Sequence, residues 1–367
     1  MKVAFFTAIK VVIVIFALIG FAFLAAYVGV NLHLTDTSGI VDSQSDVFWQ
    51  NSRNSSSTAI ILNGEDSFFN KENYCSLKIL KKEYSGEFRR IINLAFADKK
   101  EMAQKNLDAV IMALGISTGG VFSDFKNSCM VDFTTDASFG SFENLADMID
   151  VASPFAWASS SEWTFFKMGV LKDKDVLKRV ENETGIKSRI LVAELMSEQM
   201  RLYFSDRAWF EKAISPVKVL ASMSQFSLGV LGIKQETAKK IEDNLKATTS
   251  PFYLGPEFEN VLDFKTADIN AERFKRITDY HDHYYAYLYA ALYDKQIITQ
   301  WQKSGVDISN RPEVLATLYN IGFVHSSPNS EPKMGGASLM INGSEYSFGR
   351  LAYEFYYSGE LVEDFPQ

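Results

Sequence analysis

Near the N-terminus of this 367-residue chain lies a long segment without charges. Residues 11–35 read VVIVIFALIGFAFLAAYVGVNLHLT. A helix needs about 20 mainly apolar residues to cross the hydrocarbon core of a membrane, and this segment is apolar on every face. Lys2 and Lys10 precede it and Asp36 follows it, so the positive-inside rule leaves the N-terminus in the cytoplasm. The segment predicts a single-pass membrane anchor, with a cleaved signal peptide as the alternative.

The remainder of the chain has the composition of a folded acidic protein. Residues 36–367 carry 35 basic and 45 acidic side chains, a net charge of −10. With 47% hydrophobic residues, the chain has enough apolar surface for at least one full core. An acidic surface argues against a nucleic-acid partner, because binding phosphates requires basic side chains. An acidic exported region on one anchor indicates a bacterial inner-membrane protein whose C-terminal part is periplasmic.

Two cysteines, Cys75 and Cys129, both lie beyond the predicted anchor. A disulfide persists in an exported protein. Closing a loop of about 54 residues would stabilise the fold by about 4 kcal/mol in the chain-entropy model. Spacing alone does not show whether the two Cα atoms are close enough, so two buried free thiols are an equal alternative.

Local composition divides the chain into four parts. Residues 1–35 are the cytoplasmic tip and anchor, and residues 36–58, rich in Ser, Asn and Asp, predict a flexible linker. Residues 59–150 predict a small mixed α/β periplasmic domain, and residues 151–367 predict a helical domain. The expected elements of the mixed domain are strands at 59–62 and 130–133 and helices at 87–97 and 100–114.

The C-terminal region has strong helical periodicity. Its expected helices lie at 172–184, 187–204, 236–245, 271–301, 312–319 and 348–357. Gly185 is placed to end the first of these. The pair Asn342-Gly343 predicts a β-hairpin between residues 338–341 and 345–347. The expected fold class is therefore mainly α with a small α+β part.

One of these helices has a carboxyl group on its apolar face. The stripe of residues 187–204 is formed by leucines at i, i+4 and i+11, namely Leu191, Leu195 and Leu202. Glu198 occupies position i+7 of the same stripe. Burial without a cation raises the pKa of a carboxyl, which suits a general acid that works near neutral pH. The alternatives are a solvated carboxylate or an ion pair with Arg201.

Two later segments extend this observation. Residues 227–238 read SLGVLGIKQETA, and residues 312–322 read PEVLATLYNIG. With the helix that carries Glu198, they resemble the three signatures of the lysozyme-like lytic transglycosylases. In that family a helix ends in a catalytic Glu, a Ser-x-Gly segment follows, and a helix with Tyr-Asn-x-Gly closes the site. The resemblance covers residues 172–325.

The resemblance implies a fold, an activity and a set of site residues. It implies a lysozyme-like helical domain that cleaves the MurNAc-GlcNAc β-1,4 bond of peptidoglycan to give 1,6-anhydro products. Glu198 takes the place of the single acid/base, which protonates the glycosidic oxygen and then accepts the proton of the muramic acid 6-hydroxyl. Ser227, Gly229, Tyr319 and Asn320 match substrate-binding positions. The resemblance implies neither a metal nor a cofactor.

One departure from the family pattern favours a second hypothesis. Gly232 stands where the family has a Gln that contacts the sugar. The domain would then be a catalytically inactive peptidoglycan-binding or scaffold module of an envelope complex. A third hypothesis, an envelope assembly factor without glycan contact, would fit a groove around Glu198 that side chains fill. The expected partners are peptidoglycan glycan strands, the membrane through one N-terminal helix, and an envelope protein complex.

Overall fold

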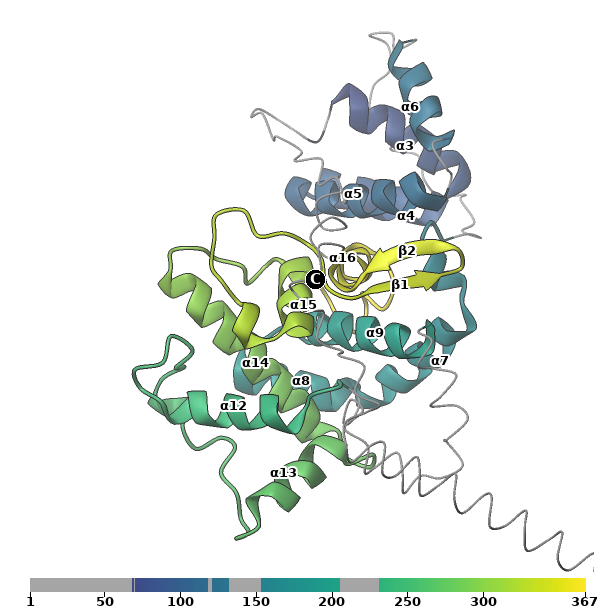
Figure 1. Ribbon diagram of the computed structural model, residues 1–367. Helices are drawn as coiled ribbons and strands as arrows, with labels where there is room; N and C mark the ends of the chain where they lie inside the picture. The colour runs from purple at the N-terminus through teal and green to yellow at the C-terminus, as the bar shows by residue number, and fades with distance from the viewer. Residues whose placement is uncertain (1–67, 69, 118–120, 132–152, 205–230) are drawn as a thin grey trace, which may run out of the picture.

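The computed structural model describes residues 68, 70–117, 121–131, 153–204 and 231–367 (Figure 1). In these residues the chain is mainly helical, with a two-stranded antiparallel sheet as its β structure. The predicted fold class, mainly α with a small β part, is confirmed at this level. None of the helices in these ranges is long and apolar enough to cross a membrane, and the anchor predicted at 11–35 lies outside them.

The N-terminal part of the described chain contains four helices: α3 (Lys71–Glu83), α4 (Ser85–Phe96), α5 (Lys100–Ser117) and α6 (Val121–Val131). Both helices expected from periodicity are present, as α4 and α5. The strand expected at 130–133 is wrong for Met130 and Val131, which complete the last turn of α6. A short apolar run fits a buried helix end as well as a strand, and here the preceding turns are helical. The strand expected at 59–62 lies outside the described residues.

A disulfide joins the first and last of these helices. Cys75 of α3 and Cys129 of α6 are bonded, with their Cα atoms 5.7 Å apart. The disulfide alternative is therefore the one observed. Because α3 and α6 pack side by side, the bond links two neighbouring helices across a separation of 54 residues.

The C-terminal part contains the helices predicted there, with one difference. Its elements are η2 (Ala156–Ser159), α7 (Ser161–Val170), η3 (Leu171–Asp173), α8 (Lys174–Thr184), α9 (Ser188–Phe204), α12 (Gln235–Lys246), η4 (Pro256–Phe258), α13 (Ile269–Thr278), α14 (Tyr284–Lys303), α15 (Pro312–Ile321), η5 (Phe323–His325), β1 (Ser338–Ile341), β2 (Ser344–Ser347) and α16 (Phe348–Tyr357). The single helix expected at 271–301 is wrong, because it is two helices, α13 and α14. Between them the Asp279 carboxylate accepts hydrogen bonds from the backbone N–H groups of His281 and Asp282. Such a local turn competes with helical hydrogen bonding and interrupts the helix.

The hairpin follows the predicted turn chemistry. β1 pairs with β2, and Ile341 lies opposite Ser344. Asn342 and Gly343 connect the strands with φ values of 49° and 80°. Two consecutive left-handed residues match the twist of a tight hairpin, and Asn-Gly adopts that conformation at low cost.

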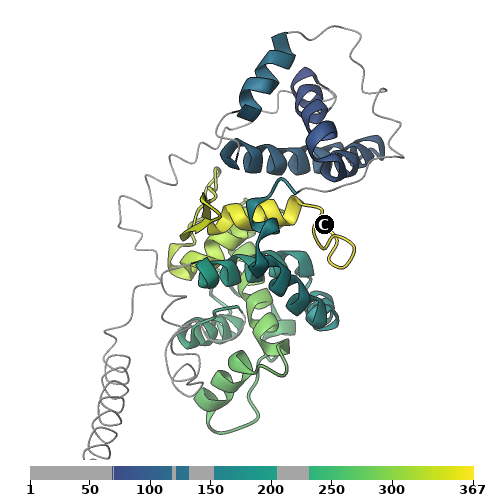
Figure 2. The same ribbon diagram turned by 90° about the vertical axis from the view of Figure 1, so that its right-hand side faces the viewer.

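Helix α16 is the element on which the two parts of the molecule meet. It packs against α9 and α15 on one side and against α5 on the other (Figures 1 and 2). Polar contacts join the two parts as well. Arg350 donates to the carbonyl of Met112 at 2.9 Å, and Arg90 donates to the carbonyl of Tyr357 at 2.8 Å. The described helices therefore form two layers that share α16.

Arg189 fixes the segment that follows α16. This residue of α9 is fully buried. Its guanidinium donates at 2.8–3.1 Å to five backbone carbonyls, those of Phe355, Tyr356, Ser358, Glu360 and Phe365. The C-terminal end of a helix carries a partial negative charge, so the cation is placed where the helix dipole favours it. One side chain thereby supplies donors to two carbonyls in the last turn of α16 and to three in the segment that follows it.

Candidate functional site

The candidate site is built on α9, whose start is defined by two features. Gly185 ends α8 with a φ of 77°, the left-handed conformation that glycine adopts without strain. The Glu181 carboxylate then accepts hydrogen bonds from the backbone N–H and the hydroxyl of Ser188. Because α9 packs on α7, α8, α15 and α16, its first three turns are almost wholly buried. Acidic residues on this helix therefore point into the protein.

Glu198 is buried as the sequence predicts, with only 5% of its surface exposed. Its carboxylate has a cationic partner one turn further along α9. Arg201 donates from Nε to Oε2 at 3.1 Å and from Nη2 to Oε1 at 2.5 Å. The ion-pair alternative is the one observed.

Tyr319 of α15 is the residue that the structure brings to Glu198. Its hydroxyl is turned inward and donates to the carbonyl of Leu231 at 2.8 Å. Burial raises the pKa of this hydroxyl well above its usual value, and the nearby carboxylates of Glu194 and Glu198 raise it further. The Tyr319 ring packs edge-on against Tyr293 of α14, with centroids 5.3 Å apart. Helices α9 and α15 pack together, and the Glu198 carboxylate acts on the Tyr319 hydroxyl through its charge.

Asn320 has a different environment. Its Oδ1 accepts a hydrogen bond from the backbone N–H of Ala337 at 2.8 Å. A Cβ on Gly336, where φ is 94°, would approach Phe348 to 2.9 Å and Asn320 to 3.1 Å. Glycine is therefore required for this loop to close on α15. Asn320 therefore holds the loop before β1.

The Ser-x-Gly segment is described only at its end. Ser227 and Gly229 lie outside the described residues. Gly232, which departs from the family pattern, has a φ of 64°. A left-handed backbone at this position favours Gly over Gln. The substitution therefore has a conformational reason in this chain.

A pair of buried carboxyls, one of them on the same helix as Glu198, was not among the predicted site residues. Glu194, one turn earlier on α9, faces Asp294 of α14, and both residues are at most 1% exposed. Burial raises the pKa of both carboxyls, and the charge of Asp294 adds to the effect on Glu194. The sequence contains a signal that could have indicated Asp294. This residue lies on the apolar stripe of α14, just as Glu198 lies on that of α9.

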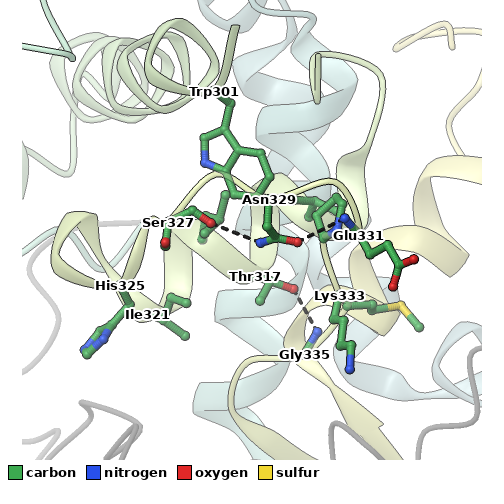
Figure 3. A pocket seen from close by; sticks show the side chains of 13 residues that line it. Trp301, Thr317, Ile321, His325, Ser327, Asn329, Glu331, Lys333 and Gly335 are labelled. Carbon is green, nitrogen blue, oxygen red and sulfur yellow. Dashed lines mark hydrogen bonds between the residues drawn. The ribbon is translucent and has the colours of Figure 1, made fainter. Parts of the chain in front are cut away.

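A pocket of about 250 Å³ lies on another face of α15 (Figure 3). Its wall contains Trp301, Val314 and Leu318. The loop that borders it is held by a hydrogen bond from the Gly335 N–H to the Thr317 hydroxyl at 2.9 Å. Neither Glu198 nor Tyr319 lines this pocket, so it is separate from the candidate site.

Metal chemistry has no evident location in the described ranges. No group of three or more His, Cys, Asp or Glu side chains there is arranged to hold a metal ion.

No known protein family, curated protein or solved structure matches the chain. The side chains of α9, α14 and α15 are therefore the basis for a functional proposal.

Proposed function

We propose that this protein is a membrane-anchored, lysozyme-like lytic transglycosylase of peptidoglycan, with Glu198 as its single acid/base. The supporting observation is the placement of a buried Glu198 beside Tyr319. In the family that the sequence resembles, a Tyr of the Tyr-Asn-x-Gly segment lies near the catalytic carboxyl. The packing of α9 against α15 supports the proposal, because these helices carry the two residues.

One carboxyl is sufficient for this reaction. Protonated Glu198 gives its proton to the glycosidic oxygen as the bond to the MurNAc anomeric carbon breaks. The resulting carboxylate takes the proton of the MurNAc 6-hydroxyl, whose oxygen closes the 1,6-anhydro ring. Water does not enter, so the second carboxyl of an ordinary glycosidase is not needed. Arg201 stabilises the carboxylate stage, and the first step requires the guanidinium to move away when the glycan binds.

The ion pair between Glu198 and Arg201 favours the second candidate function. A carboxylate held in two hydrogen bonds by a guanidinium is well suited to a structural role. In that case the domain is a peptidoglycan-binding or scaffold module without turnover. The two candidates differ in a single observable, the formation of anhydro products.

The location proposed for this activity is the periplasmic face of a bacterial inner membrane. The uncharged segment at 11–35 is the proposed anchor. The disulfide between Cys75 and Cys129 supports an oxidising compartment. Peptidoglycan glycan strands are then within reach of the domain, and an envelope protein complex is a further proposed partner.

Mass spectrometry of peptidoglycan incubated with the full-length chain in detergent tests the proposal. We expect anhydro-muropeptides from the unmodified chain and none from Glu198→Gln. Glu183→Gln is the matched control, because it makes the same change at a carboxylate on α8 that pairs with Arg179 at the surface. Reducing-end products that depend on Glu198 would indicate a hydrolase instead. Retained sacculus binding without products in any variant would favour the binding module.

A further inference from the structure

The buried pair Glu194–Asp294 lacks the partners that buried carboxylates normally have. All four carboxyl oxygens are inaccessible to solvent, and none accepts a hydrogen bond from a donor in the described residues. No Lys, Arg or His there acts on either carboxyl. Ionising both carboxyls in such surroundings is strongly unfavourable, because neither charge has a cation or a hydrogen-bond donor beside it. The pair must therefore hold at least one proton.

In the part of the chain that the structure describes, the two tyrosine hydroxyls near the pair donate to other groups. Tyr293 of α14 donates its hydroxyl to the carbonyl of Leu318, and Tyr319 of α15 donates to Leu231. Among the described residues, Glu198 of α9 also acts on Tyr319, and its carboxylate pairs with Arg201. The two carboxyls interact with each other, and all four of their oxygens are buried without another partner in the described residues. The donor between them is consequently their own proton.

This proton joins two helices of the candidate site. Glu194 belongs to α9, which carries Glu198, and Asp294 belongs to α14, which packs on α9 and supports the Tyr319 ring through Tyr293. Loss of the last shared proton would leave two adjacent negative charges in the core. Like charges in contact repel, and the low dielectric around them strengthens the repulsion.

We propose that Glu194 and Asp294 are positioning residues whose shared proton holds α9 against α14 and so sets the alkaline limit of the site. The inference rests on the proposed function for its enzymatic readout. The inference adds a pH dependence of the site that Glu198 alone does not provide. Glu198 performs the chemistry, and the pair determines the pH up to which Glu198 stays in place.

The double variant Glu194→Gln/Asp294→Asn provides the test. Two amides of the same size form a cross-helix hydrogen bond that needs no shared proton. We expect the alkaline fall in the rate of anhydro-muropeptide formation to move upward by at least one pH unit, with Glu198→Gln inactive throughout. A merely structural pair would change the rate or the stability without moving this limit. An unchanged limit overturns the proposal.

Two measurements on the full chain do not require enzyme activity. Infrared spectroscopy near neutral pH should show the carbonyl band of a protonated carboxyl that is absent from the double variant. The hydrogen exchange of the backbone amides of α9 is measured as a function of pH and corrected for the intrinsic increase of exchange with pH. The corrected rate should rise at alkaline pH in the unmodified chain, and it should rise less in the double variant. Asp294→Asn alone serves if the double variant does not fold. Lack of products from the unmodified chain refutes the proposed function alone, whereas a missing infrared band or equal exchange refutes the shared proton.

Discussion

Replacing Arg189 by Met should cost the protein much of its stability. Met fills a similar volume, but it supplies no donor. Three of the five carbonyls, those of Ser358, Glu360 and Phe365, would lose the partner that the guanidinium provides. The carbonyls of Phe355 and Tyr356 would each lose one of their donors. A hydrogen bond contributes about 1 kcal/mol net, and bonds to a charged group contribute more, so we expect a loss of about 5 kcal/mol. The total stability of a domain is typically about 5–15 kcal/mol.

Urea-induced unfolding followed by circular dichroism measures this loss. Arg189→Lys keeps the charge but concentrates its donors on one atom, so an intermediate loss is expected. Lys174→Met is the matched control, because Lys174 contacts the same C-terminal segment through Asp364 at 2.8 Å and is substantially exposed. An exposed pair contributes about 0–1 kcal/mol. If Arg189→Met lowers the free energy of unfolding by no more than Lys174→Met does, the role given to the buried guanidinium is wrong.

Three further predictions follow from other parts of the structure. In the folded state the Glu194–Asp294 pair holds at least one proton that the unfolded chain releases above about pH 4. Stability should therefore fall as pH rises from about 4 towards the raised pKa of Asp294, about 8, by about 1.4 kcal/mol per pH unit for each extra proton. Urea titrations of the unmodified chain and of Glu194→Gln/Asp294→Asn measure the difference, and parallel curves would contradict it. Replacing Cys75 and Cys129 by Ser should lower the free energy of unfolding by about 4 kcal/mol relative to the oxidised chain. Unfolding of the unmodified chain with and without reductant measures the same loss. Gly185→Ala should cost about 1 kcal/mol through its left-handed φ alone, since a Cβ there has room, and thermal unfolding would show no shift if the conformation did not matter.

The helices that sequence periodicity predicts best are those with clear end signals. Gly185 marks the end of α8, and the Asn342-Gly343 pair marks the hairpin, so both were predictable. The break between α13 and α14 was not, because Asp279 interrupts the helix through hydrogen bonds to its own neighbouring backbone. A continuous helical pattern does not reveal such a turn.

The candidate site was only partly predictable for a related reason. Periodicity placed Glu198 on a buried face, but a choice between a free carboxyl and an ion pair depends on side-chain rotamers, which the spacing of Arg201 leaves open. Asp294 meets Glu194 through tertiary packing of two helices distant in the chain. Pairings of this kind follow from the assembled fold, so the sequence of either helix alone does not predict them.

The central position of α16 constrains the order in which this protein can fold. Helices α5 and α9 bury apolar surface against α16, yet the ribosome makes both of them long before it makes residues 348–357. Until then, the two layers have no common partner, and their apolar faces stay available to chaperones or to other chains. Contacts between such distant segments slow folding, and those of α16 form only after its own synthesis. Premature termination before α16 would therefore leave both layers incomplete, even though the helix that carries Glu198 had already been synthesised.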